Sequence, residues 1–328
     1  MLIKGRKMLH LIIKKTRIFV KRIQKPKILL VFCSLNRTFA LMLETKYYKV
    51  AEHLFGVTAE ANDFELMKNY EPFCCDDASA GKTAFAITIE DGEGVDYTEE
   101  LRQDDEGQEI ICGKTADGKS VFEFSWLHQT AGFLVCSNDY REGTLIVKGQ
   151  HRKLAIDNTL MVLYALATAA HGTALFHSAV VSHEDKAYMF LGKSGTGKST
   201  HARLWLKYIS GTALVNDDNP VVRVFDKEHV IVYGSPWSGK TPCYRNVSYP
   251  LGGIVLLSQA PYNKIRRLKG IEAYAALVPS ISGKRWDSRI ADGLHQTENA
   301  LAQSVRIWHL ECLPDEEAAK VCQESVER

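Results

Sequence analysis

The chain has 328 residues, of which 45% are hydrophobic and 24% are charged. This length allows two ordinary domains, and the composition is typical of a soluble globular protein, which excludes a largely disordered or fibrous chain. The apolar runs fall short of the roughly 18 residues that a membrane span needs, so we expect no transmembrane segment.

The formal net charge of +2 is unevenly distributed. Residues 1–41 carry eleven basic side chains and no acidic one, whereas the rest of the chain has 30 basic and 39 acidic side chains, a charge of −9. An acidic body favours no nucleic-acid partner. For the basic head, residues 1–41, we favour disorder or a translation start at Met42, and keep open a surface or nucleic-acid contact and a targeting role.

The eight cysteines include no C-x-x-C pair and no zinc-like spacing. Such a pattern is typical of reduced thiols and favours a cytoplasmic location.

Residues 42–150 contain short segments in which apolar and polar residues alternate. This pattern predicts an antiparallel β-rich layer. Turn signals such as Asp91-Gly92 and Glu142-Gly143 separate the segments, and Asp104-Asp105-Glu106-Gly107 is expected to be an exposed loop.

The pattern changes near Leu154, where apolar residues recur at helical spacing up to Ala170, with Asp157 or Asn158 as a candidate N-cap and Gly172 near the end. Strands and helices then alternate through 151–328, which predicts an α/β domain. Expected strands are 174–181, 187–191, 213–215, 221–225, 229–233, 253–257 and 304–310, and expected helices are 199–209, 271–278 and 314–324, the last with Pro314 at its first position.

A strong motif, G-x-x-x-x-G-K-S, spans 192–199 and lies between an apolar strand and an amphipathic helix. Glycines in such a loop let backbone N–H groups converge on phosphate oxygens, and the helix start adds its positive dipole end. The motif predicts ATP binding by Gly192, Ser194, Gly195, Thr196, Gly197, Lys198, Ser199 and Thr200. Lys198 would bridge the β- and γ-phosphates, and the Ser199 hydroxyl would bind Mg²⁺.

A second formal match, residues 234–241, also follows a strand, but Pro236 removes a donor and no amphipathic helix follows. We keep three readings open: a true phosphate loop, an active-site loop that contributes Lys240, and a structural turn.

The strand Ala213–Val215 leads through Asn216 into two adjacent carboxylates, Asp217 and Asp218. A strand-end aspartate near the phosphates is a candidate second Mg²⁺ ligand, and its neighbour is a candidate base for an attacking hydroxyl. His177 lies 15 residues before the loop, and its spacing alone favours a structural role.

Together, His177-Ser178-Ala179, the loop with Phe190 and Leu191 before it, and Leu214-Val215-Asn216-Asp217-Asp218 resemble the catalytic half of the HPr kinase/phosphorylase family, and share motifs with the ATP-dependent phosphoenolpyruvate carboxykinases. The resemblance covers about residues 151–328. It implies a P-loop kinase core, with Ser199 and Asp217 on Mg²⁺, Asp218 as general base, Lys198 on the phosphates and His177 beside the transferring phosphoryl group. The acidic residue that HPr kinases carry on the following strand has no counterpart here.

The expected function is therefore an ATP- and Mg²⁺-dependent kinase with a hydroxyl acceptor on a protein, a peptide (Ser favoured) or a small molecule. The alternatives are a carboxykinase-like lyase and a non-catalytic nucleotide-binding regulator. A homo-oligomer is compatible with the sequence. Candidate charge stabilisers are Lys240, Arg245, Lys284, Arg285 and Arg289.

Overall fold

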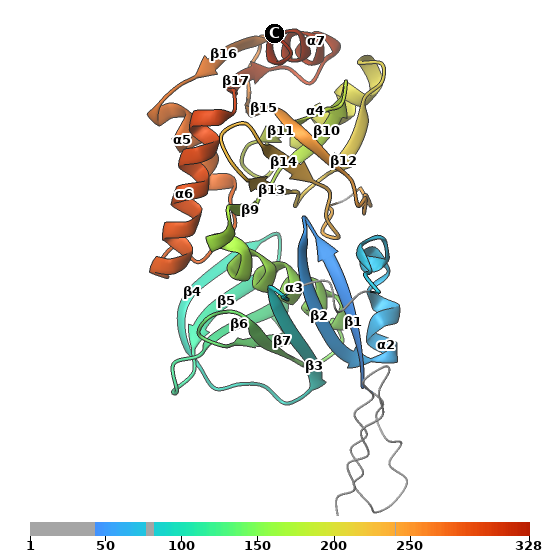
Figure 1. Cartoon of the computed structure of the whole chain (residues 1–328), viewed down its shortest axis with the longest axis vertical. Helices are drawn as coiled ribbons and strands as arrows, with labels where there is room; N and C mark the ends of the chain where they lie inside the picture. Colours follow the sequence, from blue (N-terminus) through green and yellow to red (C-terminus); the bar gives the residue numbers. More distant parts are fainter. Residues whose placement is uncertain (1–42, 77–81, 240) are drawn as a thin grey trace, which may run out of the picture. The chain divides into compact units, whose positions relative to one another are not determined.

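The structure, a computed structural model, describes residues 43–76, 82–239 and 241–328. Glu44–Arg328 form one compact unit. It is a mixed α/β protein with two multi-strand sheets and several helices (Figure 1). The basic head and Lys240 lie outside the described residues.

The first sheet, as far as the chain is described, has eight strands in the order β1-β2-β3-β8-β7-β6-β5-β4. Two short helical segments, α2 (Ala61–Leu66) and η2 (Lys68–Phe73), connect the second strand to the third. The strands are β1 (Leu43–Val50), β2 (His53–Glu60), β3 (Phe85–Asp91), β4 (Thr98–Asp105), β5 (Gln108–Lys114), β6 (Ser120–Trp126), β7 (Gln129–Cys136) and β8 (Glu142–Val147).

The prediction that this layer is antiparallel is correct for β4 to β8 and wrong for β3. This strand runs parallel to both of its neighbours, β2 and β8. Parallel neighbours need a crossover between them. The segment with α2 and η2 supplies one crossover, and the meander from β4 to β7 supplies the other.

Helix α3 (Arg152–Thr168) packs against strands of both sheets, among them β7, β8 and β9. Its N-terminus lies earlier than predicted, with His151 at the cap position and Asp157 and Asn158 inside the helix. Tertiary contacts fix this start, because Arg152 pairs with the fully buried Asp63. A short 3₁₀ turn, η3 (Ala169–His171), follows, and Gly172 ends it with a left-handed φ of 63°.

Residues 152–171 are long and apolar enough to cross a membrane by length and composition alone. Of the most apolar window of this helix, 61% is buried inside the protein. A core helix of a folded domain has this property, and α3 lies between the two sheets in the fold.

The second sheet, within the described residues, has nine strands, with the order β12-β10-β11-β15-β14-β13-β9 and with β17 beside β15 and β16 beside β17. Strands β11, β15 and β17 are parallel at its centre. The strands are β9 (Thr173–Leu175), β10 (Ala179–His183), β11 (Lys186–Leu191), β12 (Ala213–Asn216), β13 (Val221–Val224), β14 (Val230–Tyr233), β15 (Ser248–Gln259), β16 (Lys264–Leu268) and β17 (Ile307–Cys312).

One predicted strand, 174–181, is in fact two. The chain leaves β9 at Leu175 and starts β10 at Ala179, and the residues between them bond to other segments. The His177 N–H donates to the Ser280 carbonyl at 2.7 Å, and the Ser178 N–H donates to the Asp218 carbonyl at 2.8 Å. An apolar run of this kind predicts a buried, extended backbone. It does not predict where one strand ends and the next strand begins.

The remaining helices are α4 (Lys198–Tyr208), α5 (Ile271–Leu277), η4 (Val278–Ser280), α6 (Ser288–Ser304) and α7 (Glu316–Val326). The prediction of Pro314 inside the last helix is wrong, because Asp315 caps it by accepting from the Ala318 N–H. Helix α6 was not predicted, although Asp287 caps it and Ile290, Leu294 and Leu301 form its buried face.

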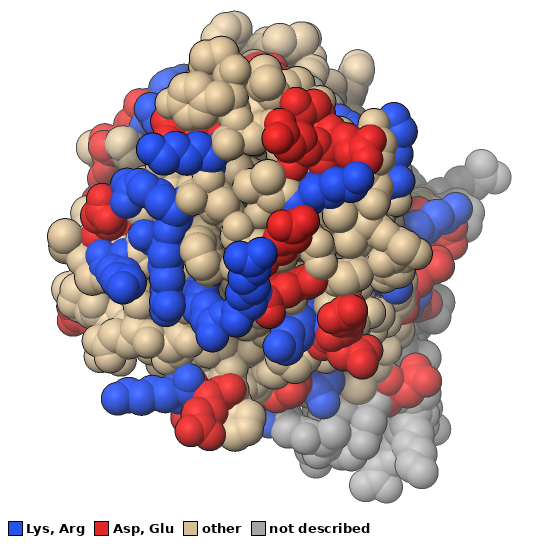
Figure 2. Space-filling model, turned by 90° about the horizontal axis from the view of Figure 1, so that it is seen from above, with Lys and Arg blue, Asp and Glu red and all other residues tan. Residues whose placement is uncertain are grey.

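Figure 2 shows one face of the protein, on which Lys and Arg side chains form a broad group with Asp and Glu beside it. The acidic excess of the chain after residue 41 is therefore not spread evenly over the surface.

Candidate nucleotide-binding site

The glycine-rich loop connects β11 to α4. Gly192, Gly195 and Gly197 have φ values of 152°, 76° and 109°, and Gly197 takes the cap position of α4. L-residues with a Cβ rarely adopt these conformations, so the glycines at the motif positions allow the loop to turn from the strand into the helix. The loop thereby has the strand–loop–helix order that the sequence predicts.

Helix α4 is held against β11 by its buried face. Trp205 is fully buried, and its ring lies 5.6 Å from that of Phe190 and 5.3 Å from that of Tyr188. The Trp205 Nε1–H donates to His201 Nε2 at 3.2 Å, and burial lowers the pKa of His201 to about 4, which keeps this ring neutral. Burial of such a tryptophan is worth roughly 2–3 kcal/mol and fixes the start of α4 beside the loop.

Lys198 is 7% exposed and lies over its own loop. Its ammonium donates to the carbonyls of Gly192 at 3.1 Å and Lys193 at 3.4 Å. Burial lowers its pKa, and the nearby carboxylates of Asp218, Asp105 and Asp217 oppose this shift. The charge is thus held at the loop by carbonyl oxygens and three acidic side chains.

The carboxylates of Asp217 and Asp218 follow β12 and have different surroundings. Asp217 is 6% exposed, and no hydrogen bond or ion pair reaches its carboxylate from the described residues. Asp218 accepts from the Asn219 side chain at 2.8 Å, and its backbone N–H donates to the Asn216 side chain at 2.8 Å. Asn216 in turn donates to Ser235 and Trp237, which fixes the end of the strand.

His177 faces Asp218, with 3.4 Å between His177 Nε2 and Asp218 Oδ1. Burial raises the pKa of Asp218, although the charges of His177 and Lys198 oppose the shift. Burial and the Lys198 charge lower the pKa of His177. The hydrogen bond from the Ser178 N–H to the Asp218 carbonyl holds these two segments together.

A cavity of about 610 Å³ brings most of the predicted residues together. Its lining includes nearly all of the sequence candidates, namely His177, Ser194, Gly195, Gly197, Lys198, Ser199, Thr200, Asp217 and Asp218. Gly192 and Thr196 belong to the same loop but do not line the cavity. The roles assigned to these residues remain predictions.

The same cavity is lined by residues of the first sheet that sequence reasoning missed. Gln103, Asp105 and Glu106 come from the β4–β5 hairpin, whose turn has positive φ at Glu106 (53°) and Gly107 (88°), as a tight hairpin requires. The prediction of an exposed loop is correct for Glu106 at the turn, but Asp104 and Asp105 are exposed residues at the end of β4. Asp105 also acts electrostatically on Lys198, His177 and Asp218. Only the tertiary arrangement brings this acid to the glycine-rich loop.

Two further missed residues contact or flank the loop. Gln259, at the end of β15, donates through its side-chain amide to the Gly195 carbonyl at 3.3 Å. Arg203, one turn into α4, lines the cavity and is exposed. A single arginine inside a predicted helix does not by itself indicate a function. Its position one turn after Ser199 could have identified Arg203 as a candidate residue of this site.

Four of the candidate charge stabilisers do not line this cavity, although Lys284 and Arg285 line the cavity beside it. Arg245 donates to the Leu214 carbonyl and does not line the cavity. Lys284 pairs with Glu100 at 3.1 Å, and Arg285 pairs with the buried Glu298 at 2.6 Å. Arg289 lines a different cavity.

The second formal motif, 234–241, forms a supporting loop in the part that is described. The buried Ser235 donates to the Asn219 carbonyl at 2.6 Å, and Trp237 Nε1–H donates to the Tyr70 hydroxyl at 2.9 Å. No helix follows in 241–247. This segment therefore holds the end of β12 in place rather than forming a second cradle, and Gly239 alone of its described residues lines the cavity.

A second cavity, of about 570 Å³, adjoins the first. The two share Gln103, Ile110, Met161, His177 and Ser282. Apolar side chains dominate the lining of the second cavity, among them Leu101, Phe122, Val162 and Trp286. His177 thus lies at the boundary between a polar and an apolar cavity.

The donor set around the loop fits a divalent cation. The Ser199 hydroxyl and the Asp217 carboxylate line the same cavity, and both are oxygen ligands of the kind that Mg²⁺ prefers. The Asp217 carboxylate lines the cavity and has no hydrogen-bond partner among the described residues, so its oxygens are available to a cation.

Comparison with known proteins gives little that bears on identity. No family model matches the chain, and no curated protein matches it. Among solved structures, the HPr(Ser) kinase/phosphatase from Coxiella burnetii is similar with a TM-score of 0.28 and 10% sequence identity, over 46% of this chain and 93% of that chain. At this TM-score the similarity does not establish a common fold or activity.

Proposed function

We propose that this protein is a P-loop kinase that binds ATP with Mg²⁺ and transfers the γ-phosphoryl group to a hydroxyl, with a protein or peptide Ser as the favoured acceptor. The observation that carries the proposal is the single cavity lined by the phosphate loop, the Asp217–Asp218 pair and His177. A phosphate cradle, metal-ligand oxygens and a carboxylate that can accept a proton are the parts that phosphoryl transfer to a hydroxyl requires.

The phosphate loop would hold the triphosphate. Backbone N–H groups around Gly195 and Gly197 and the start of α4 would bind phosphate oxygens, and Lys198 would exchange its two loop carbonyls for the β- and γ-phosphates. Ser199 and Asp217 would hold Mg²⁺, which when bound neutralises charge on the phosphates.

Asp218 would take the proton from the acceptor hydroxyl as the new O–P bond forms and the bond to ADP breaks. Burial raises the pKa of Asp218 and makes this carboxylate a better base than an exposed aspartate. His177, with its pKa lowered, would be neutral near pH 7, and from 3.4 Å its ring would orient the Asp218 carboxylate.

The apolar cavity beside His177 would receive the body of the acceptor. It meets the polar cavity at the His177–Gln103 boundary, and a hydroxyl that enters from this side would approach the γ-phosphate there. Its lining favours an acceptor with an apolar group next to the hydroxyl.

We also propose a cytoplasmic location. The cysteines among the described residues are free thiols, as is usual in a reducing compartment.

The proposal is tested by incubating the protein with γ-labelled ATP and a library of Ser-containing peptides, with and without Mg²⁺. We expect Mg²⁺-dependent transfer or, without a suitable acceptor, slow release of phosphate, and we expect Lys198→Ala to abolish it. Lys193→Ala, an exposed loop lysine that does not line the cavity, is the matched control and should retain activity. Release that persists in Lys198→Ala would argue against this site.

A further inference from the structure

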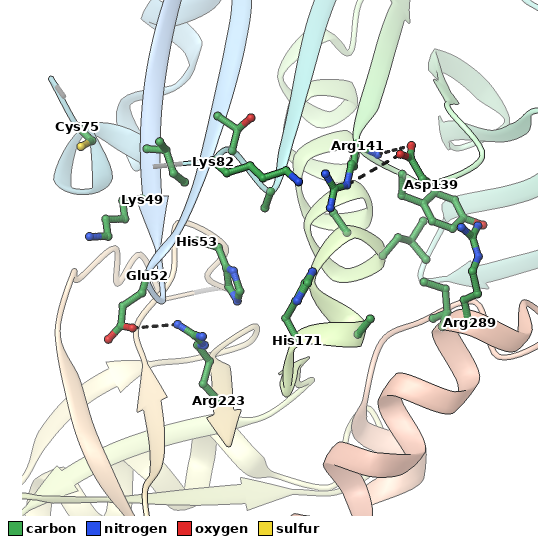
Figure 3. A pocket seen from close by; sticks show the side chains of 18 residues that line it. Lys49, Glu52, His53, Cys75, Lys82, Asp139, Arg141, His171, Arg223 and Arg289 are labelled. Atoms are coloured by element: carbon green, nitrogen blue, oxygen red, sulfur yellow. Dashed lines mark hydrogen bonds and ion pairs between the residues drawn. The ribbon is translucent and has the colours of Figure 1, made fainter. Parts of the chain in front are cut away.

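A third cavity, of about 560 Å³, lies apart from the nucleotide cavity and shares no lining residue with it. Its walls come from β2, the end of α3, β13, the β7–β8 turn and the start of α6 (Figure 3). This volume suits a small metabolite.

Basic side chains outnumber acidic ones in this cavity. Five of them line it, namely Lys49, Lys82, Arg141, Arg223 and Arg289. The acidic residues of the lining are Glu52 and Asp139. The cavity therefore carries a formal charge of about +3 in a chain whose residues after 41 sum to −9, so the excess of positive charge is local.

Several of these charges have no close ion pair among the described residues. Lys49 and Lys82 have no hydrogen bond or ion pair with any of the described residues. The Arg141 guanidinium lies 3.9 Å from the Asp139 carboxylate, which also accepts from the Arg141 backbone N–H at 3.2 Å. In Figure 3 the side chains of Lys82, Arg141 and His171 extend toward the same space. The like charges of Lys82 and Arg141 repel each other, and an anion between them would offset this repulsion.

Arg223 forms the inner wall. Its side chain is 15% exposed, and one of its terminal nitrogens donates to both Glu52 and the Ala51 carbonyl at 3.0 Å. Its Nε–H is buried and has no partner among the described residues, which is uncommon for a buried donor. Burial and the charges of Arg223 and His171 lower the pKa of the neighbouring His53 to about 3, as expected in a positive local potential.

We propose that this cavity binds a small molecule with two or more anionic groups, phosphates or carboxylates. Lys82 and Arg141 would bind it from the outer side, and the Arg223 end of the cavity would face its inner group. Arginine and lysine provide the planar and point-like donors that such groups require.

The test is calorimetric titration of the full chain with pyrophosphate and, separately, with tricarballylate, at low ionic strength and without Mg²⁺. We expect at least one of the two to bind. Binding of pyrophosphate alone would indicate a phosphate ligand, and binding of tricarballylate alone would indicate a carboxylate ligand. Lys82→Gln/Arg141→Gln should weaken the binding by about tenfold or more, because two charged donors are lost. Both residues are exposed, so the fold should be retained.

Two controls separate this site from others. Lys227→Gln/Lys269→Gln removes the same charge from exposed positions that line none of the three cavities and should change the affinity less than threefold. Lys198→Ala should leave the binding in this cavity in place and remove only pyrophosphate held by the glycine-rich loop. The proposal is overturned if neither anion binds, if the two double variants behave alike, or if Lys198→Ala removes the binding and Lys82→Gln/Arg141→Gln does not.

Discussion

Asp217 and Asp218 are neighbours in the sequence, but their side chains have different environments. Asp217 is nearly buried and has no hydrogen-bond partner within the described residues, whereas Asp218 is paired with His177 and Asn219. An unpaired carboxylate suits a metal ligand, and a carboxylate with a raised pKa suits a base.

This difference predicts separate effects for the two amide substitutions. Asp217→Asn should weaken Mg²⁺-dependent ATP binding and slow turnover together, because a metal ligand acts in the ground state as well. Asp218→Asn should leave Mg·ATP affinity within a few-fold while turnover falls by roughly 10² to 10⁴. ATP-binding titrations and phosphate release measure both, and an exchange of the two effects would reverse the assignment.

The pH dependence of turnover tests the same residue. The base must be deprotonated, and burial raises the pKa of Asp218, so activity should fall with decreasing pH at a higher pH than an ordinary aspartate near pH 4 would give. His177 and Asp218 interact, so this acidic limb belongs to the pair. The residual activity of Asp218→Asn should lack the limb. If it kept the same limb, another group would be the base.

Among the elements, those with strong local signals were predicted well from the sequence. The strand β11, the loop and helix α4 lie within a residue or two of their predicted positions, because glycine chemistry and an apolar helix face are local. The break at 176–178 was not predicted, since it depends on hydrogen bonds to Ser280 and Asp218, which are distant in the sequence. The exposed Asp105 gave no sign that its hairpin lines the cavity.

Helix α6 was missed although it has a cap and a buried face, because Gly293 in its interior weakens the helical pattern. The structure explains that glycine. A Cβ at position 293 would lie 2.5 Å from the Ala169 carbonyl oxygen, so only glycine lets α6 approach η3 this closely.

Gly293→Ala should therefore destabilise the protein. The backbone contact would have to open at a cost of about 1–3 kcal/mol, which exceeds the gain of about 1 kcal/mol in helix propensity. Gln296→Ala, at an exposed position one turn later, is the control and should change little. Urea denaturation measures both, and an unchanged or higher midpoint for Gly293→Ala would show that the contact yields easily.

At the scale of the whole molecule, the candidate site combines both sheets. The glycine-rich loop and the aspartates follow strands of the second sheet, and Gln103 and Asp105 belong to the first. The sequence indicated no chemistry for residues 42–150, because side chains of one hairpin gain a role only through the packing of the two sheets around α3.

The compact unit begins at Glu44, and this bears on the basic head. If the basic head is untranslated or disordered, as the sequence favours, a chain that starts at Met42 should fold and bind ATP like the full chain, because a disordered segment adds little stability. Thermal unfolding of the two chains compares them, and a fall of several degrees on truncation would contradict the expectation.

The most direct test of the central claim is a calorimetric titration of the folded wild-type protein with Mg·ATP, repeated on Lys198→Ala. We expect one saturable site per chain that weakens by tenfold or more in the variant, because Lys198 is the charged donor of the phosphate loop. Absence of ATP binding to the folded wild-type protein, or equal affinity in Lys198→Ala, would contradict the proposal that this loop binds ATP.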